Sequence, residues 1–398
     1  MQQMGADTVA IIFSAPPTYR SRDSEYAYRQ NSDFYYLTGF CEAHAVLILS
    51  PGTSTPVTLF NQAPDPKMEQ WTGPRIGQQD AVNHYGVDAA FSIDQIDEKL
   101  PALLANKKLI YFPWGENSIR ERMSKWIKQA MQNTRYMPWP DLTALQKLIE
   151  TMRLIKSPEE IELLKESARI SAHAHNHAMQ FIKPGMMEYQ LAGEYIHQFT
   201  QHGARDIAYL PIVGGGKNAC ILHYIANNDV LRDGDLVLVD AGCEYQYYCA
   251  DISRTFPVNG RFTDTQRAVY NAVLNAYLAG LEKMKPGSDW TFVRSAVDES
   301  LKLGLRDLKL PGELSEYFMH GPGHWLGLDV HDAGPYKIDE KPTIFKPGMV
   351  LTLEPGLYIN DWQIGIRIED DILITEQGHE VLSKDSPILP EDIEQLMR

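Results

Sequence analysis

The chain has 398 residues, of which 44% are hydrophobic and 22% are charged, and its formal net charge is −15. This composition is typical of a globular protein long enough for two domains, and it excludes disordered and fibrous classes. The excess of acid excludes a nucleic-acid partner, because a phosphate backbone requires a basic protein face. Four cysteines are too few for a disulfide framework in a chain of this length.

The amino-terminal residues 1–17 lack the basic region and the long apolar run of a signal peptide. No stretch of the sequence approaches the roughly 18–20 apolar residues that a membrane helix needs. The sequence therefore predicts a soluble, cytoplasmic protein without a membrane partner.

Short apolar runs alternate with amphipathic segments in the first part of the chain. Residues 8–13, 45–50, 56–60 and 107–112 have the composition of strands, and residues 116–133 have the apolar spacing of a helix. This alternation predicts an α/β domain.

A helix start follows at residues 157–160, where a serine N-cap precedes a proline and two glutamates. We place a domain boundary near residue 153, which gives an amino-terminal domain of residues 1–153 and a second domain of residues 154–398. The second domain runs as helices, hairpin, helices and hairpin. We therefore interpret it as one αβ unit that occurs twice, with pseudo-twofold symmetry.

The first hairpin carries two acids. A turn between Tyr245 and Gln246 sets Asp240 and Asp251 directly opposite each other on one face. Directly opposed residues have Cβ atoms roughly 5 Å apart, and like charges at this distance repel.

The second hairpin repeats the arrangement with Glu354 and Glu369, which oppose each other across a turn between Asp361 and Trp362. Four carboxylates in otherwise apolar strands predict that cations supply the missing positive charge. Oxygen-rich ligation suits Mn²⁺, with Co²⁺, Fe²⁺ or Zn²⁺ as alternatives.

A histidine-rich segment, HGPGHWLGLDVHD, lies between the hairpins and supplies the imidazole that such a site needs. The spacing does not choose between His320, His324 and His331. One imidazole and four carboxylates can hold two metal ions about 3.5–4 Å apart that share a hydroxide nucleophile.

These motifs together resemble a known family. The segment with Asp240 and Asp251, HGPGHWLGLDVHD, TLEPGLY and GIRIEDD are similar to those of the pita-bread metallopeptidases of family M24, above all aminopeptidase P. The likeness extends to SEYAYRQNSDFYYLTGF and QWTGPRIGQ near the start of the chain. It implies an α/β first domain of the creatinase-N type and an α+β pita-bread catalytic domain.

The resemblance assigns five metal ligands, which are Asp240, Asp251, His324, Glu354 and Glu369. Asp251 and Glu369 would bridge both ions. Asp240 would bind one ion through both of its oxygens, and His324 with Glu354 would complete the other.

Other residues receive roles from the same resemblance. His223 would line the site and contact the intermediate, with a core histidine on a strand as the alternative. His331 would face the scissile carbonyl oxygen or the proline nitrogen. His320, Tyr358 and Arg367 would border the pocket for the residue after the cleaved bond. The alternative role for Arg367 is to hold a carboxylate in place rather than to contact the substrate.

The implied activity is hydrolysis of the N-terminal Xaa-Pro bond in peptides with proline at the second position. A bridging hydroxide would attack the carbonyl before proline once Glu354 has accepted its proton, with His331 and His223 assisting the oxyanion. A prolidase, restricted to Xaa-Pro dipeptides, shares the five ligands and both domains and is the alternative activity. A pita-bread domain that binds peptides or histones without metals is the alternative of a different class, and the five retained ligands argue against it.

The first domain would support a homo-oligomer, a dimer or a tetramer, with Trp71 reaching a neighbouring active site. Ordinary packing of Trp71 within its own domain is the alternative. A second histidine cluster, His173, His175 and His177, lies on a predicted helix without flanking acids. We interpret it as a solvated or partly packed helix face and not as a metal site.

Overall fold

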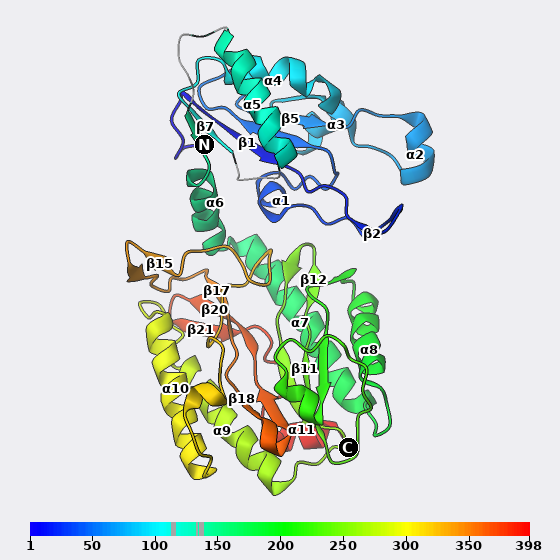
Figure 1. The fold of residues 1–398 in the computed structure, drawn as a ribbon, viewed down its shortest axis with the longest axis vertical. Coiled ribbons are helices and arrows are strands. Elements are labelled where there is room, and N and C mark those ends of the chain that lie inside the picture. Colours follow the sequence, from blue (N-terminus) through cyan, green and yellow to red (C-terminus); the bar gives the residue numbers. More distant parts are fainter. Residues whose placement is uncertain (113–116, 133, 135–138) are drawn as a thin grey trace. The chain divides into compact units, whose positions relative to one another are not determined.

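The chain forms two compact units, Met1–Glu150 and Thr151–Arg398 (Figure 1). The division falls close to residue 153, where the sequence placed a domain boundary. In the part of the chain that the structure describes, no helix has the length and apolar character needed to cross a membrane. The structure is a computed structural model and describes residues 1–112, 117–132, 134 and 139–398.

The first unit is built around a six-stranded sheet in which β1 lies antiparallel to β4 and parallel to β7. The four strands and the helix predicted for this unit are confirmed, although Glu116 and Asn133, the ends of the predicted helix, lie outside the described residues. In order across the sheet, the strands are β6 (Ala89–Ser92), β5 (Val57–Asn61), β4 (Val46–Leu49), β1 (Thr8–Phe13), β7 (Leu109–Tyr111) and β8 (Trp139–Asp141).

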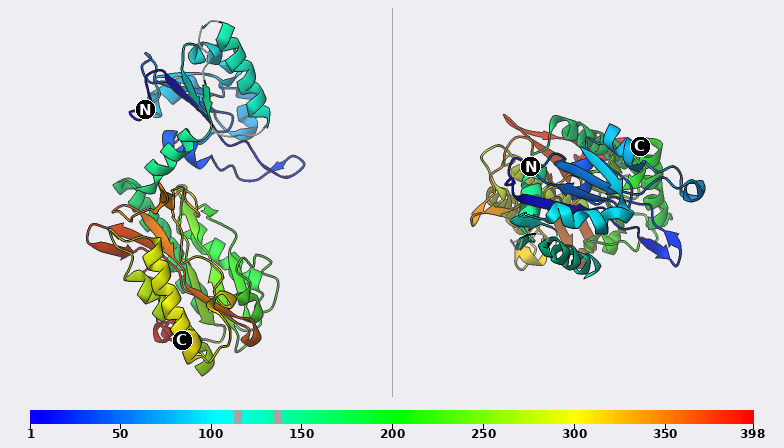
Figure 2. Two further views of the ribbon diagram at one scale, coloured as in Figure 1. Left: turned by 60° about the vertical axis from the view of Figure 1, so that its left-hand side comes forward. Right: turned by 90° about the horizontal axis from the view of Figure 1, so that it is seen from above.

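Side-chain alternation along β1 explains why both faces of this sheet are covered. Val9 and Ile11 join a core with α4 and α5, whereas Ala10 and Ile12 join a second core with α1, α3 and α6, because successive strand residues point to opposite faces. The helix α5 lies along one face of the sheet (Figures 1 and 2). The helices are α1 (Ser32–Thr38), α2 (Pro66–Thr72), α3 (Gly77–His84), α4 (Ile96–Leu104), α5 (Asn117–Gln132) and α6 (Ala144–Leu154), and a short hairpin of β2 (Tyr19–Ser21) and β3 (Ser24–Glu25) precedes α1.

The second unit follows the predicted order of helices and hairpins. It begins with α7 (Pro158–Phe181), which Ser157 caps in a reciprocal capping box with Glu160, as predicted. The helices α7 and α8 pack against each other, as do α9 and α10, and all four helices join one core with the strands (Figure 1). The other helices are α8 (Glu188–Gln201), α9 (Asp264–Leu281), α10 (Trp290–Asp307) and α11 (Pro390–Leu396).

The strands of the second unit direct one face to the helices and the other to the acids. Val237 and Val239 of β11 join the core with the helices, whereas Leu238 packs against Tyr358 on the opposite face, where Asp240 also points. The strands are β9 (Asp206–Ile207), β10 (Ile212–Gly215), β11 (Leu236–Asp240), β12 (Cys243–Tyr245), β13 (Tyr248–Cys249), β14 (Ser253–Pro257), β15 (Lys337–Ile338), β16 (Lys341–Pro342), β17 (Val350–Leu353), β18 (Gly356–Ile359), β19 (Ile364–Arg367), β20 (Asp370–Thr375) and β21 (Gly378–Val381).

The register of the first hairpin differs from the prediction. Asp240 pairs with Ser253, so the chain turns at Gln246 and Tyr247, one residue later than expected. Both turn residues have positive φ angles, 48° and 72°, as a two-residue turn between twisted strands requires. Asp251 therefore lies diagonally from Asp240, and the prediction of direct opposition is wrong, because neither Gln nor Tyr marks such a turn in a sequence.

The second hairpin has the predicted register. The pairs β17–β20 and β18–β19 continue one register on either side of the acids, which sets Glu354 opposite Glu369. A bridge between Ser253 and Glu369 joins this hairpin to the first one, with the Glu369 N–H donating to the Ser253 carbonyl over 3.1 Å. All four acids are thereby brought to one place.

A buried ion cluster fixes the histidine-rich segment. The carboxylate of Asp332 accepts hydrogen bonds from Lys156 over 3.0 Å and from Arg153 over 2.5 Å. Burial alone raises the pKa of Asp332, but the two cations outweigh it and hold that pKa below its usual value. The Asp332 N–H also donates to the Trp325 carbonyl over 2.9 Å, so the cluster holds the chain next to His324.

Replacing Asp332 by alanine tests this cluster, because it leaves the buried Lys156 without its carboxylate. We expect Asp332→Ala to lower the free energy of unfolding by about 3–5 kcal/mol. As a matched control, Arg169→Ala breaks the more exposed pair with Glu166 and costs under about 1 kcal/mol. Urea unfolding followed by circular dichroism measures both, and equal stabilities of the two variants would contradict the assignment.

Candidate metal centre

A cavity of about 300 Å³ opens beside the two hairpins of the second unit. Its walls consist mainly of carboxylates and imidazoles, which is the donor set of a divalent-metal site rather than of an apolar ligand pocket. The lining residues are Leu222, His223, Asp240, Asp251, His320, His324, His331, Glu354, Arg367 and Glu369. The cavity therefore brings together all five residues predicted as metal ligands.

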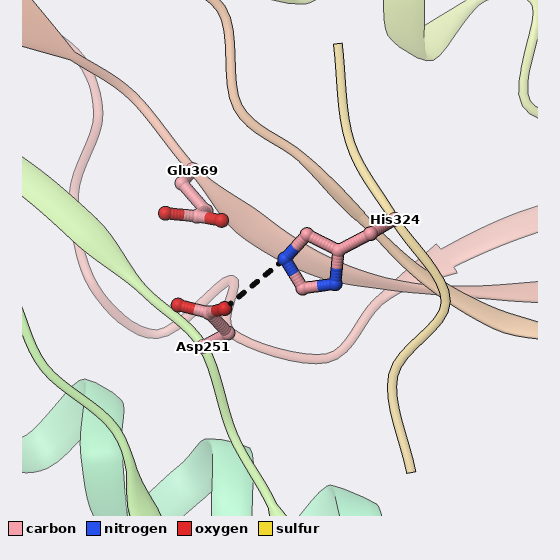
Figure 3. Close-up of side chains that lie close together, drawn as sticks. All are labelled: Asp251, His324 and Glu369. Atoms are coloured by element: carbon pink, nitrogen blue, oxygen red, sulfur yellow. Dashed lines mark ion pairs between the residues drawn. The ribbon is translucent and has the colours of Figure 1, made fainter. Parts of the chain in front are cut away.

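Three of these residues form a close group. One ligand atom from each of Asp251, His324 and Glu369 lies within 4.8 Å of the others, and Figure 3 shows the two carboxylates and the imidazole converging. His324 Nε2 lies 3.3 Å from Asp251 Oδ2 and 3.8 Å from Glu354 Oε1. Of the three imidazoles that the spacing left open, His324 is the one in this group.

Backbone contacts orient the imidazole of His324. The backbone N–H of His324 donates to Thr352 Oγ1 over 3.0 Å, and the backbone N–H of Thr352 donates to the His324 carbonyl over 2.9 Å. These bonds anchor the segment on β17. His324 Nδ1 lies 2.9 Å from the Trp325 carbonyl oxygen, which can only accept a hydrogen bond. In the neutral ring the proton therefore sits on Nδ1, and Nε2 points into the cavity as a metal-binding atom.

Burial and mutual repulsion leave the centre short of positive charge. Burial, with the neighbouring carboxylates, raises the pKa of Glu354 to about 7 and that of Asp240 to about 6, and it raises the pKa of Glu369 well above its usual value. Burial opposes protonation of His324, but Asp251 and Glu354 outweigh it and raise the pKa of His324 to about 9. Burial opposes ionisation of Asp251 as well, but the hydrogen bond and charge of His324 outweigh it and hold the pKa of Asp251 below its usual value. Three carboxylates and one imidazole that retain protons in this way fit divalent cations, which bind the deprotonated ligands.

Arg367, at the wall of the cavity, holds the acids through hydrogen bonds. Its side chain is buried and donates to Asp240 Oδ2 over 2.6 Å, to Ser253 Oγ over 2.7 Å and to the Tyr358 hydroxyl over 3.0 Å. Ser253 Oγ in turn donates to Glu369 Oε2 over 2.6 Å. One of the two roles considered for Arg367 is to hold a carboxylate in place. The contacts that this role requires are present.

Tyr209, between β9 and β10, is a candidate site residue that the sequence analysis missed. Its hydroxyl lies 2.5 Å from Asp240 Oδ1 and 2.6 Å from Asp251 Oδ1. Burial, followed by the charges of the two aspartates, raises the pKa of Tyr209 well above its usual value. The phenol therefore stays protonated and serves as a hydrogen-bond donor to the aspartates. No local spacing links this tyrosine to either aspartate, and the sequence therefore carried no signal for it.

Three further histidines face the cavity. His320 Nε2 lies 2.8 Å from the Tyr358 hydroxyl, and burial lowers the pKa of His320 to about 3. The ring of His331 lies 4.4 Å from that of His324, and burial, then the His324 charge, lowers the pKa of His331. His223 lies on an exposed loop between β10 and β11. The alternative of a core histidine on a strand is therefore wrong.

Two other predicted features lie outside the set of cavity-lining residues. Trp71 on α2 is 84% exposed, so the alternative of ordinary packing within its own domain is wrong. On α7, His175 is fully buried and lies 2.9 Å from the Tyr195 hydroxyl, whereas His173 is exposed and His177 is half-buried. This helix face is thus partly packed, as the sequence indicated.

The fold and the acid-rich centre together define a metallopeptidase. The chain belongs to metallopeptidase family M24: the model of that family matches residues 162–376, and the model of the aminopeptidase P N-terminal domain matches residues 1–111. The chain is 45% identical to the Xaa-Pro aminopeptidase of Escherichia coli K12, with 100% of this chain and 95% of that protein aligned. It is 34% identical to human Xaa-Pro aminopeptidase 3, with 99% of this chain and 82% of that protein aligned.

Solved structures agree over the whole chain. A Pseudomonas aeruginosa aminopeptidase superposes with a TM-score of 0.96 at 41% identity and covers 100% of this chain and 95% of its own. Proline aminopeptidase P II from Yersinia pestis superposes with a TM-score of 0.94 at 47% identity and covers 99% and 96%. The aminopeptidase P of Escherichia coli with the inhibitor Pro-Leu gives 0.94 at 44% identity, with 99% and 95% covered. These likenesses confirm the predicted fold class.

Stabilisation by divalent ions should grow with pH. The folded-state pKa values of Asp240, Glu354 and His324 all lie above their ordinary values, so between about pH 5 and 9 the folded protein binds more protons than the unfolded chain. The contribution of these groups to the stability of the metal-free protein is lost as pH rises through that range. Because ions replace these protons, we expect the gain in Tm from saturating Mn²⁺ over EDTA to be larger at pH 8.5 than at pH 6.

Two variants control this measurement. Glu369→Gln changes a predicted ligand and should abolish the response, whereas Glu376→Gln changes an exposed acid in the turn between β20 and β21 and should retain it. A gain in Tm of the same size at both pH values in the unsubstituted protein would contradict the charge deficit described for the centre.

Proposed function

We propose that this chain is a metal-dependent Xaa-Pro aminopeptidase. The observation that carries the proposal is the group of Asp251, His324 and Glu369 in a carboxylate-lined cavity. It occurs in a chain whose relatives, named Xaa-Pro aminopeptidases, align along nearly their whole length. Asp240 and Glu354 line the same cavity and complete the proposed five-ligand set.

The proposed ligand set suits two divalent ions, with Mn²⁺ in first place and Co²⁺, Fe²⁺ or Zn²⁺ as alternatives. When bound, these ions supply Lewis-acid polarisation of the scissile carbonyl and lower the pKa of a water molecule. Asp251 and Glu369, which stand in the close group with His324, would hold both ions.

Glu354 is the proposed general base. Its carboxylate lines the cavity, and bound cations would keep it deprotonated, so that it could accept a proton from the attacking water and deliver that proton to the proline nitrogen. His331, whose pKa is lowered, stays neutral and can donate a hydrogen bond to the developing oxyanion. His223 lines the same cavity and is the second proposed donor.

Peptides with proline at the second position are the proposed substrates. The proline nitrogen carries no hydrogen, so a peptidase that binds the N–H of the scissile peptide bond loses a contact with an Xaa-Pro substrate. A pocket that needs no hydrogen bond from this nitrogen can accept the Xaa-Pro bond. His320, Tyr358 and Arg367 are proposed to border the pocket for the residue after the cleaved bond. His320 Nε2 lies 2.8 Å from the Tyr358 hydroxyl, to which Arg367 also donates.

A homo-oligomer, a dimer or a tetramer, is proposed as the working form. The 84% exposure of Trp71 supports it, because this ring is free to contact another copy and aromatic side chains are enriched at protein interfaces. Trp71 would then reach the active site of a neighbouring copy. The cytoplasmic location stays a prediction.

Peptide hydrolysis tests the proposed function. The manganese-loaded protein should cleave Xaa-Pro-Yaa tripeptides and should leave Xaa-Ala-Yaa peptides of the same length nearly intact, as followed by chromatography of the released amino acid. Turnover of Xaa-Pro dipeptides without cleavage of the tripeptides would favour a prolidase, and peptide binding without any cleavage would favour a non-catalytic module.

A pair of aspartate variants links that activity to the centre. Asp251→Ala should abolish cleavage and metal binding. The loss of activity should exceed the roughly 100-fold loss that follows when a residue that only contacts a metal ligand is removed. Asp206→Ala, an exposed change on β9, should keep both. Full activity in the Asp251 variant would contradict the proposed ligand set.

A further inference from the structure

A buried carboxylate outside the metal centre organises one wall of the cavity. Glu188, the first residue of α8, has 0% of its surface exposed. Its Oε1 accepts hydrogen bonds from the Gly215 N–H and from Asn218 Nδ2, each over 2.9 Å. Its Oε2 accepts from the Tyr224 hydroxyl over 2.9 Å and from the Asp229 N–H over 2.8 Å. A carboxylate that accepts four such bonds is held in one orientation, and it holds its donors in turn.

All four donors belong to one stretch of chain, residues 215–229. This stretch contains Leu222 and His223, which line the cavity, whereas Glu188 is outside that lining set. Residues 221–226 form neither helix nor strand, and four of them are exposed, namely Ile221, His223, Ile225 and Ala226. Glu188 therefore anchors the loop on which a proposed catalytic histidine stands.

Tyr224 is the link between this anchor and the cavity. It directly follows His223, and its phenol reaches back to Glu188 while also lying 3.1 Å from Asn218 Nδ2 and from Asn228 Oδ1. The next side-chain anchor along the loop is Asn227, which accepts from the Val213 N–H over 2.9 Å. Tyr224 is thus the tether placed beside the imidazole.

The imidazole of His223 lines the same cavity as those of His320 and His331. When a side chain that contacts the reacting carbonyl is displaced by roughly 1 Å, the rate of the reaction falls by about 100-fold. The orientation of the loop is therefore an essential part of what His223 can do.

We propose that Glu188 is a positioning residue that acts through Tyr224 to hold His223 over the cavity. The proposal rests on the proposed peptidase function for its effect on rate. Removing the Glu188 carboxylate leaves buried donors unsatisfied, and removing the Tyr224 hydroxyl releases the tether while keeping the aromatic ring. Both changes free the loop without touching any of the five proposed metal ligands.

A double-mutant cycle on the manganese-loaded full-length protein tests this link. We expect Tyr224→Phe and Glu188→Gln each to lower kcat for a Xaa-Pro-Yaa peptide by about 10- to 100-fold, with metal content unchanged and with a smaller effect on KM. In a His223→Gln background the same changes should lower kcat less than about twofold, because the contact that they support is already gone. Tyr189→Phe, an exposed tyrosine on the same helix, is the matched control and should keep full activity.

Hydrogen exchange gives a second reading that needs no activity. Peptides covering residues 221–226 should exchange faster in Tyr224→Phe and Glu188→Gln than in the unsubstituted protein and in Tyr189→Phe, because local opening becomes easier. Equal loss of kcat in both His223 backgrounds, or unchanged exchange in this loop, would overturn the proposal. An unsubstituted protein that fails to cleave Xaa-Pro peptides would instead overturn the proposed function, and the exchange measurement would still test the tether.

Discussion

Repulsion among four crowded carboxylates is the constraint on which this structure depends. Asp240 and Asp251 come from one hairpin and Glu354 and Glu369 from another, and the bridge between Ser253 and Glu369 brings the two hairpins together. Unpaired anions in such a place cost several kcal/mol each, so the metal-free centre retains protons and the pKa values of three of the four acids are raised. The pair of divalent cations that we propose would supply positive charge in place of these protons.

Positively charged and hydrogen-bonding groups beside the carboxylates make this crowding possible. Arg367 reaches Asp240, and the fully buried Arg254 donates to the Glu369 carbonyl over 2.6 Å and to Asp370 over 2.7 Å. These contacts tie the backbones of both hairpins together and leave carboxylate oxygens directed into the cavity. Ligands held in this way are oriented before a metal arrives, which is how outer contacts raise metal affinity.

The sequence predicted much of the site because its signals were local. The second hairpin had the expected register because its apolar strands are symmetric about residues 361 and 362. The first hairpin did not, because its turn needs positive φ at Gln246 and Tyr247, residue types that give no sign of it. Tyr209 was missed for a different reason, since its contacts with the aspartates depend on how β9 and β10 fold beside the hairpin. Glu188 was likewise invisible as an anchor, because its donors lie 27 or more residues away.

Anomalous diffraction from manganese-soaked crystals tests the central claim most directly, namely that the four acids and His324 exist to hold a pair of cations. The account predicts two peaks at the manganese edge inside the cavity, about 3.5–4 Å apart, with Asp251 and Glu369 between them. The absence of any peak there, or a single peak that contacts neither Asp251 nor Glu369, would contradict it.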